Sequence, residues 1–179
     1  MIHATAIVET EKVGEGTNVW AYAHVMSGAV IGENCNIGDH TFVEGGASIG
    51  NGCTIKNGCL IWDGVTIGDG VFLGPGVIFT NDQFPRSPRL GSAVSRYESK
   101  EWLSPTTVEQ GSSIGAGAVI CPGVKLGAYC MVGAGSVVTR DVAPHALVIG
   151  NPAKQAGHVC KCGKRATTTA EVPNCGQCP

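Results

Sequence analysis

The sequence predicts an all-β fold, a parallel β-helix in which short strands stack into a solenoid, and three observations lead to this prediction. Large aliphatic residues recur at every sixth position through most of the chain. The residue two positions before each of them is usually small. The residue three positions after each of them is usually glycine. A repeat this strict is typical of a solenoid whose coils share one continuous core.

Two positions of each hexad are expected to face inward, because residues two apart point to the same side of a strand. A narrow column has no room for two large inward residues on each side, so a large residue alternates with a small one. The large position is occupied, before and after an interruption, by Ile7, Val13, Val19, Val25, Ile31, Ile37, Val43, Ile49, Ile55, Ile61, Ile67, Leu73 and Phe79, and by Val108, Ile114, Ile120, Leu126, Val132 and Val138.

The corners of the predicted coils are expected at the glycine position, where the backbone needs a positive φ. Asn34 and His40 occupy the same position and tolerate this conformation better than most residues. Three hexads make one coil of eighteen residues, and parallel pairing should stack the coils about 4.8 Å apart.

Composition narrows the range of functions. The 179-residue chain has 27 glycines, 15% charged residues and a formal net charge of −2, which gives no electrostatic reason to expect nucleic acid or an anionic membrane as partner. No run is long and apolar enough for a transmembrane helix, and the N-terminus lacks the features of a signal peptide, so we expect a cytoplasmic protein. Cys35, Cys53, Cys59 and Cys130 occupy the small inward position, where we expect buried, structural thiols.

The chain divides into a β-helix domain at residues 1–150 and a tail at residues 151–179. The hexads stop after Phe79 and resume at Val108 out of phase, so residues 80–107 are expected to leave the coils as one long loop. A long loop on a rigid scaffold usually carries function. A solvated Ω-loop without a further role is the alternative.

One outward face of the solenoid is predicted to differ from the other two. Positions eighteen apart stack on one face, and only the first face is dominated by large apolar side chains. We call it the apolar face; its residues are His24, Met26, Phe42, Glu44, Leu60, Trp62, Ile78 and Thr80. Such a patch predicts a protein interface that runs into the root of the loop. Within it, the polar His24 and Glu44 are either site residues or partners across the interface.

Three stretches of the sequence resemble a known family. They are the hexads, the run FTNDQFPRS at 79–87 and the run VGAGSVVTRDVAPHALVIGNPAK at 132–154. Over about residues 1–155 the chain resembles the left-handed β-helix acyltransferases, and within them the bacterial sugar-nucleotide N-acetyltransferases. EGG at 44–46 and IWDGVTI at 61–67 favour the subgroup acting on UDP-2-acetamido-3-amino-2,3-dideoxy-glucuronate. The dTDP-3-amino-3,6-dideoxyhexose acetyltransferases are the alternative.

The resemblance implies left-handed coils, a homotrimer with active sites between subunits, acetyl-CoA along the C-terminal coils, and a role in the synthesis of bacterial surface polysaccharide such as lipopolysaccharide. The reaction is attack of a sugar amine on a thioester, which needs an oriented amine, a proton acceptor and a donor for the oxyanion. We expect Asn81 to bind the amine or the oxyanion. We expect Asp82 to hold Asn81, orient the amine or accept its proton. No histidine lies at the loop root, and we favour the departing CoA sulfur as proton acceptor.

Five further residues are expected to bind the nucleotide sugar. His24 and Glu44 lie on the apolar face, and Trp62 suits stacking on the sugar or base, although it equally suits an interface. Arg86 and Arg89 in the loop suit a uronic carboxylate or the diphosphate, unless they are simply exposed.

Five residues are assigned to acetyl-CoA by the resemblance. Ala116 and Ala134 are one coil apart and should line a groove for the pantetheine arm, where small residues let it approach the backbone. Arg140 and Lys154 are expected to meet the phosphates, and Pro152 to lie near the adenine. Ordinary hexad packing accounts for the small residues as well.

The tail, HVCKCGKRATTTAEVPNCGQCP, contains the close pairs Cys160–Cys162 and Cys175–Cys178. Two such pairs, each beside glycine, resemble zinc knuckles, and a reducing cytoplasm disfavours disulfides. We expect one structural zinc ion, with a metal-free or disordered tail as the alternative.

Two other classes stay open at this point. A γ-class carbonic anhydrase would need three convergent histidines, and the five histidines of this chain show no close-paired spacing of ligands. A non-catalytic assembly module would use the same scaffold, but it would not need the specific run at the loop root.

Overall fold

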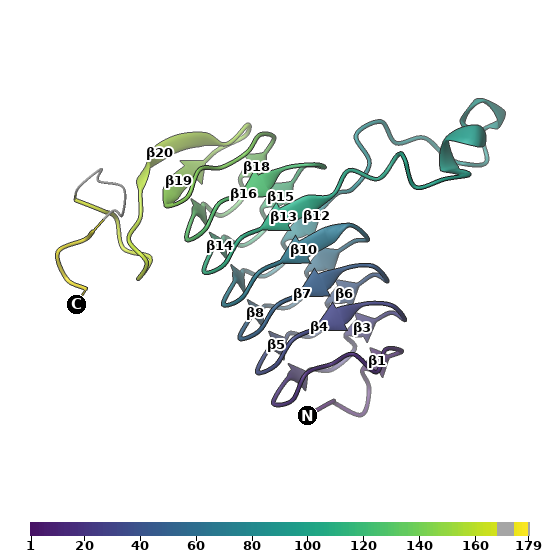
Figure 1. The fold of residues 1–179 in the computed structure, drawn as a ribbon, viewed down its shortest axis with the longest axis horizontal. Helices are drawn as coiled ribbons and strands as arrows, with labels where there is room; N and C mark the ends of the chain where they lie inside the picture. The colour runs from purple at the N-terminus through teal and green to yellow at the C-terminus, as the bar shows by residue number, and fades with distance from the viewer. Residues whose placement is uncertain (168–173, 179) are drawn as a thin grey trace.

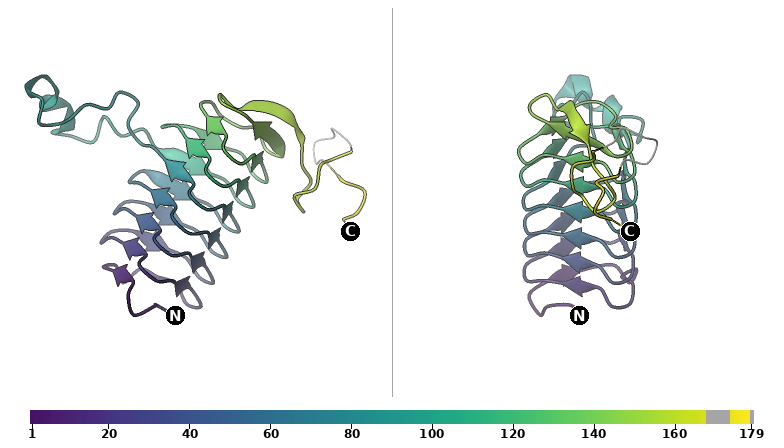
Figure 2. Two further views of the ribbon diagram at one scale, coloured as in Figure 1. Left: turned by 180° about the vertical axis from the view of Figure 1, so that it is seen from behind. Right: turned by 90° about the vertical axis from the view of Figure 1, so that its left-hand side faces the viewer.

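The computed structural model describes residues 1–167 and 174–178, which form a three-sided column of stacked coils (Figure 1). The N-terminus lies at one end of the column and the last strands lie at the other. One long loop and the C-terminal tail project from the column in different directions (Figure 2). The predicted β-helix is confirmed.

Within the described residues, each side of the column is one sheet. The first sheet contains β1 (Ile7–Val8), β3 (His24–Val25), β6 (Phe42–Val43), β9 (Leu60–Ile61), β12 (Ile78–Phe79), β15 (Val119–Ile120) and β18 (Val137–Val138). The second contains β4 (Val30–Ile31), β7 (Ser48–Ile49), β10 (Val65–Ile67), β13 (Thr106–Val108) and β16 (Lys125–Leu126). The third contains β2 (Asn18–Val19), β5 (Asn36–Ile37), β8 (Thr54–Ile55), β11 (Phe72–Leu73), β14 (Ser113–Ile114), β17 (Met131–Val132), β19 (Ala146–Ile149) and β20 (Lys154–His158).

Parallel pairing fixes the register of the coils. Val25 pairs with Val43, one coil of eighteen residues apart, and the same spacing repeats in all three sheets. The loop between β12 and β13 does not disturb this order, because Ile67 pairs with Val108 across it. The coils therefore resume in register after the interruption.

The core fills the inside of the column with the side chains that the hexads predicted. From Val19 onward the large position is buried in every predicted hexad, as at Ile55 and Leu126, which are fully buried. The small-position thiols are buried and free as well. Burial raises the pKa of Cys59, and that of Cys130 to about 11, so both stay protonated thiols at neutral pH.

The corners also agree with the prediction. Twelve glycines occupy the corner position, and all of them have a positive φ. Asn34 and His40, at the same position, have φ of 54° and 57°. Tyr22 and Tyr129 occupy the same position with φ of 58° and 57°. The backbone conformation of a corner is therefore set by the coil and not by glycine alone.

The first coil departs from the prediction. Ile7 was expected in the core, but its side chain is 56% exposed. Val8, not Ile7, pairs with Val25, and Ile7 pairs with His24, so the spacing between Val8 and Val13 is one residue short of a hexad. This slip turns Ile7 to the outer side of the sheet.

The other end of the column closes with a hairpin. Strand β19 pairs parallel with β17, and β20 then pairs antiparallel with β19. The boundary predicted at residue 150 falls in the turn of this hairpin, so the first residues of the tail complete the third sheet.

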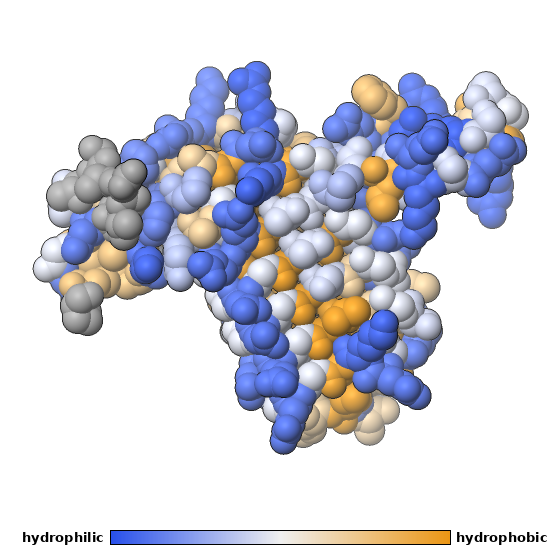
Figure 3. Space-filling model, viewed as in Figure 1, coloured by the Kyte–Doolittle hydropathy of each residue, from blue (hydrophilic) through white to orange (hydrophobic). Residues whose placement is uncertain are grey.

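The long loop carries the two short 3₁₀ turns η1 (Gly91–Ala93) and η2 (Ser95–Tyr97). Hydrophilic side chains cover much of its surface (Figure 3), although Phe84 and Leu90 are exposed. Among the described residues no helix is long and apolar enough to cross a membrane.

Candidate active site

Asn81 lies where the loop leaves the first sheet. Its side-chain Nδ2 donates a hydrogen bond to the backbone oxygen of Asp63 at 3.1 Å. Its backbone oxygen accepts a hydrogen bond from Ser104 N at 2.9 Å, which joins the outgoing and returning limbs of the loop. Asn81 is half-buried, and among the described residues its Oδ1 accepts no hydrogen bond. The carboxamide is thus fixed at one end and open at the other.

Asp82 holds the loop together. Its carboxylate accepts hydrogen bonds from the Tyr97 hydroxyl at 2.8 Å and the Phe84 backbone N–H at 2.8 Å, and it forms an ion pair with Arg96. The Arg96 guanidinium also lies over the rings of Phe84 and Tyr97, and within the described residues its buried Nε has no hydrogen-bond partner. Burial favours the neutral carboxyl, but these partners outweigh it and hold the pKa of Asp82 below its usual value.

A second polar cluster occupies the corner beside Asn81. Glu44 accepts a hydrogen bond from the backbone N–H of Asp63 at 2.9 Å. The Asp63 carboxylate accepts one from Lys100 Nζ, which arrives from the returning limb of the loop, at 2.5 Å. The sequence did not single out Asp63 or Lys100, because only the fold brings them to the same corner.

The apolar face is present as predicted. His24, Phe42 and Trp62 lie on consecutive coils, with ring centroids 5.5 Å apart between the first two and 5.2 Å between the last two. His24 Nε2 lies 3.0 Å from Glu9 Oε1, a partner that the hexad pattern did not reveal. In the single chain every residue of this face is partly exposed. Trp62 packs against Phe42 within its own chain, and so supports the interface interpretation at least as well as stacking on a ligand.

The loop arginines Arg86 and Arg89 are exposed. Arg86 donates to the backbone oxygen of Pro85, and in the described residues neither guanidinium contacts a carboxylate. The structure does not bring them together with Glu44 or Trp62.

The segments expected to bind CoA line a groove of about 380 Å³ on the third sheet. Gly115 and Gly133 lie in its wall, with Ala134 at its rim. A Cβ at Gly115 would overlap the backbone of Ala134, so glycine is required for the coils to approach. Ala116 is exposed at the adjoining corner.

The phosphate and adenine candidates lie beyond the groove. Arg140 follows β18 and is exposed, whereas Pro152 and Lys154 lie in and after the turn between β19 and β20. Arg140 therefore follows a strand of the first sheet, whereas Lys154 lies in a strand of the third.

The four tail cysteines come together. The Sγ atoms of Cys160, Cys162, Cys175 and Cys178 all lie within 4.8 Å of one another. Three Sγ–Sγ distances are 3.5–3.6 Å, far longer than a disulfide bond and close to the edge, about 3.8 Å, of a tetrahedron with Zn–S bonds of about 2.3 Å. Backbone N–H groups of Cys162 and Cys175 lower the pKa of Cys160 to about 6. In the described residues this is the one group of three or more potential metal ligands, so the histidines form no such set.

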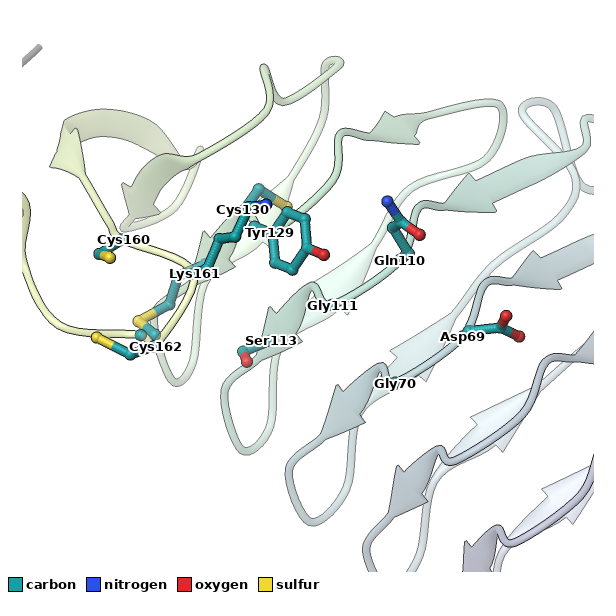
Figure 4. Close-up of a pocket in the computed structure, with 12 residues that line it drawn as sticks. Asp69, Gly70, Gln110, Gly111, Ser113, Tyr129, Cys130, Cys160, Lys161 and Cys162 are labelled. Atoms are coloured by element: carbon teal, nitrogen blue, oxygen red, sulfur yellow. The ribbon is translucent and has the colours of Figure 1, made fainter. Parts of the chain in front are cut away.

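A pocket of about 500 Å³ separates the tail from the third sheet (Figure 4). Lys161, between two of the cysteines, lies over the ring of Tyr129, and Tyr129 stacks on His145. His145 Nδ1 and the backbone oxygen of Val159 are 3.0 Å apart. This column of side chains docks the cysteine cluster against the coils.

Comparison with known proteins agrees with this architecture. The sequence matches the family model described as bacterial transferase hexapeptide (six repeats) at residues 12–45, 46–81 and 105–140. Over 161 residues it is 55% identical to a protein of Aneurinibacillus thermoaerophilus named dTDP-3-amino-3,6-dideoxy-alpha-D-galactopyranose 3-N-acetyltransferase. This match covers 90% of the chain and 79% of the relative.

Solved structures are similar in fold. A maltose O-acetyltransferase from Clostridium difficile 630 matches with a TM-score of 0.54 and 26% identity, over 69% of this chain and 68% of that one. The acetyltransferase domain of PglB from Neisseria gonorrhoeae, in complex with acetyl coenzyme A, matches with a TM-score of 0.53 and 21% identity. That match covers 86% of this chain and 56% of the PglB domain chain, and it bears on the fold alone.

Proposed function

This chain belongs to the bacterial hexapeptide-repeat transferase family, and we propose that it transfers an acetyl group from acetyl-CoA to the 3-amino group of a dTDP-linked 3-amino-3,6-dideoxyhexose. The observation that carries the chemistry is the half-buried Asn81 carboxamide, fixed by Asp63 at the junction of the apolar face and the loop. The 55% identity to the Aneurinibacillus enzyme supports the dTDP sugar over the UDP-linked uronic acid suggested by the short motifs.

In the proposed reaction the sugar amine attacks the thioester carbonyl. The C–N bond forms, the C–S bond breaks, and the amine proton passes to the departing CoA sulfur. Asn81 orients the amine, whose N–H its open Oδ1 can accept, or stabilises the oxyanion through the second N–H of Nδ2, and positioning supplies most of the rate. Asp82 serves this site by ordering the loop, because its carboxylate is occupied by Arg96 and Tyr97.

The proposed enzyme is a homotrimer. The apolar face is only partly covered in the single chain, and burying it against a second copy removes apolar surface from water. The pantetheine arm of acetyl-CoA is assigned to the groove along Gly115 and Gly133. Arg140, Pro152 and Lys154, which lie outside the lining of this groove, are assigned to the phosphates and the adenine.

We also propose that the four tail cysteines hold one structural zinc ion. Their Sγ spacing and their all-sulfur donor set suit tetrahedral zinc, which such a closed site binds without a free position for a substrate. The zinc would stabilise the tail and take no part in acetyl transfer.

The function is tested by mixing the purified protein with acetyl-CoA and a panel of dTDP- and UDP-linked 3-amino sugars. Release of the CoA thiol, detected with a chromogenic disulfide, should be fastest with the dTDP-linked sugars. Acetyl-CoA without a sugar is the control for hydrolysis. Absence of thiol release with every sugar would overturn the proposal, and a preference for the UDP-linked uronate would overturn the substrate.

A further inference from the structure

The carboxylate of Asp63 is built into the corner beside Asn81. Its side chain is only 16% exposed, and its backbone is held on both sides, by Glu44 at the N–H and by Asn81 at the oxygen. Gly46, one coil below, leaves the space that the carboxylate fills, because a Cβ there would overlap Asp63 Oδ1. This carboxylate is a fixed part of the coil.

Its partner Lys100 is different. The Lys100 side chain is 72% exposed and comes from the loop, not from a coil. Its hydrogen bond to Asp63, together with the charge of Glu44, raises the pKa of Lys100 above the usual value. The corner thus has two carboxylates and one ammonium group. Exposed ion pairs of this kind contribute little stability, so another amine can replace Lys100 at small cost.

On the basis of the proposed function, we infer that Asp63 positions the acceptor amine of the sugar and that Lys100 holds the place of that amine in the free enzyme. The sugar amine binds as an ammonium ion, which pairs with Asp63 as Lys100 does. After it releases one proton to water, the neutral amine still donates one N–H to Oδ2 of Asp63, and its lone pair is free for the thioester. The same position lies beside the Asn81 carboxamide, since Asn81 and Lys100 both bind Asp63. A sugar with a hydroxyl in place of the amine stays neutral and cannot form this ion pair, so the corner selects amino sugars.

The inference is tested by calorimetric binding of two ligands to the full chain in the presence of CoA. One is a dTDP-3-amino-3,6-dideoxyhexose and the other is the same sugar with a 3-hydroxyl. The wild type should prefer the amino sugar about tenfold or more, as expected for a hydrogen bond to a charged group. Asp63→Asn should remove most of this preference, because it should weaken binding of the amino sugar more than binding of the hydroxy sugar.

Lys100 provides the second arm of the test. Lys100→Met removes the internal competitor and should tighten binding of the amino sugar up to about fivefold, the range of an exposed ion pair. In the Asp63→Asn background the same change should have no effect, because Lys100 acts only through Asp63. Lys125→Met is the matched control, since Lys125 is similarly exposed and pairs with Glu109 at 2.7 Å on the second sheet.

The inference is wrong if Asp63→Asn retains the preference for the amino sugar, or if Lys100→Met weakens binding. Thermal melting of each variant shows whether it is folded, and Asp63→Glu, which retains the charge, should recover part of the preference. Turnover is measured separately. If the protein binds the amino sugar preferentially but shows no turnover, the proposed function is wrong and the amine site stands. If the protein shows turnover and Asp63→Asn keeps the preference, the proposed function stands and the role of Asp63 is wrong.

Discussion

Asn81 and Asp82 are adjacent in the sequence but have different surroundings. Asn81 uses its Nδ2 to hold the Asp63 corner and keeps Oδ1 open, whereas both carboxylate oxygens of Asp82 bind partners inside the loop. An open carboxamide beside an apolar face suits contact with a reacting group. A fully engaged carboxylate suits a structural role. Replacing Asn81 is therefore expected to lower turnover, whereas replacing Asp82 is expected to loosen the loop.

Replacing Asn81 by alanine should lower kcat by roughly 10²–10³, the usual cost of losing one hydrogen bond that stabilises the oxyanion, with loss of the acceptor for the amine N–H acting in the same direction. The KM for acetyl-CoA and the mass of the assembly should not change. Steady-state kinetics of thiol release measure the effect. Asn57→Ala, at an exposed corner between β8 and β9, is the matched control. Near-normal kcat in Asn81→Ala, with loss of activity in a histidine variant, would instead indicate a histidine base.

Lowering the pH should loosen the loop, because the carboxylate of Asp82 becomes protonated. The folded-state pKa of Asp82 is below its unfolded value of about 3.9. Its carboxylate therefore stabilises the docked loop above about pH 3.9, and this stabilisation is lost as the pH falls through the folded pKa. Hydrogen exchange of the Phe84 amide, corrected for intrinsic rate, should show constant protection from pH 7 to 5 and a fall below about pH 4.

Asp82→Asn should show the reduced protection of Phe84 already at pH 7. Asp39→Asn, at a corner between β5 and β6, should behave like the wild type. Full protection of Phe84 in Asp82→Asn would show that another contact holds the loop.

At the scale of elements, the tail is held to the column by two sets of contacts. Strand β20 pairs with β19, and beyond it the Val159 N–H donates to the His145 oxygen at 2.8 Å. Lys161 then lies over Tyr129, directly beside the cysteine cluster. The cluster and the docking contacts are only one or two residues apart in sequence, so closure of the cluster should support docking.

Cys175→Ser should abolish binding of about one zinc ion per chain, because a tetrahedral site loses a ligand. Elemental analysis of protein purified without chelator measures the metal, and hydrogen exchange of Val159 should rise as the tail loosens. Cys121→Ser, a partly exposed cysteine outside the cluster, is the control. Wild-type protein without metal, or unchanged zinc in Cys175→Ser, would contradict the zinc proposal.

At the scale of the whole molecule, the three sides of the column are not equivalent. The same backbone pairing forms all three sheets, but only the first presents a continuous set of large apolar side chains on its outer surface. The loop root and the Asp63 corner lie at the edge of this sheet. Assembly and catalysis are therefore expected to depend on the same side of the column.

Leu60→Asp combined with Ile78→Asp should convert the expected trimer to monomers, because two unpaired charges would be buried at the interface. Sedimentation velocity at micromolar concentration measures the change in mass. Val30→Asp is the control, since Val30 is 37% exposed on the second sheet. A wild-type protein that sediments as a stable monomer would rule out the trimer.

The sequence alone determined the coils, the three sheets, the core and the place in the chain where the coils are interrupted. The reason is that each strand pairs with the strand eighteen residues away, so one local pattern specifies packing along the whole column. The pattern failed where the spacing changes, at Ile7 and in the hairpin of β19 and β20. The close cysteine pairs also predicted the cluster of four thiols, because the spacing within each pair of ligands is a local property of the sequence.

The tertiary structure alone decided which side chains meet at the loop root. Nothing periodic relates Asp82 to Arg96, or Asp63 to Lys100, because these pairs form only where an irregular loop folds back on itself and on a corner. It likewise decided that Tyr129, His145 and Lys161 stack under the tail. A repeat fixes what lies one coil away, whereas contacts between an insertion and the coils depend on the full path of the chain.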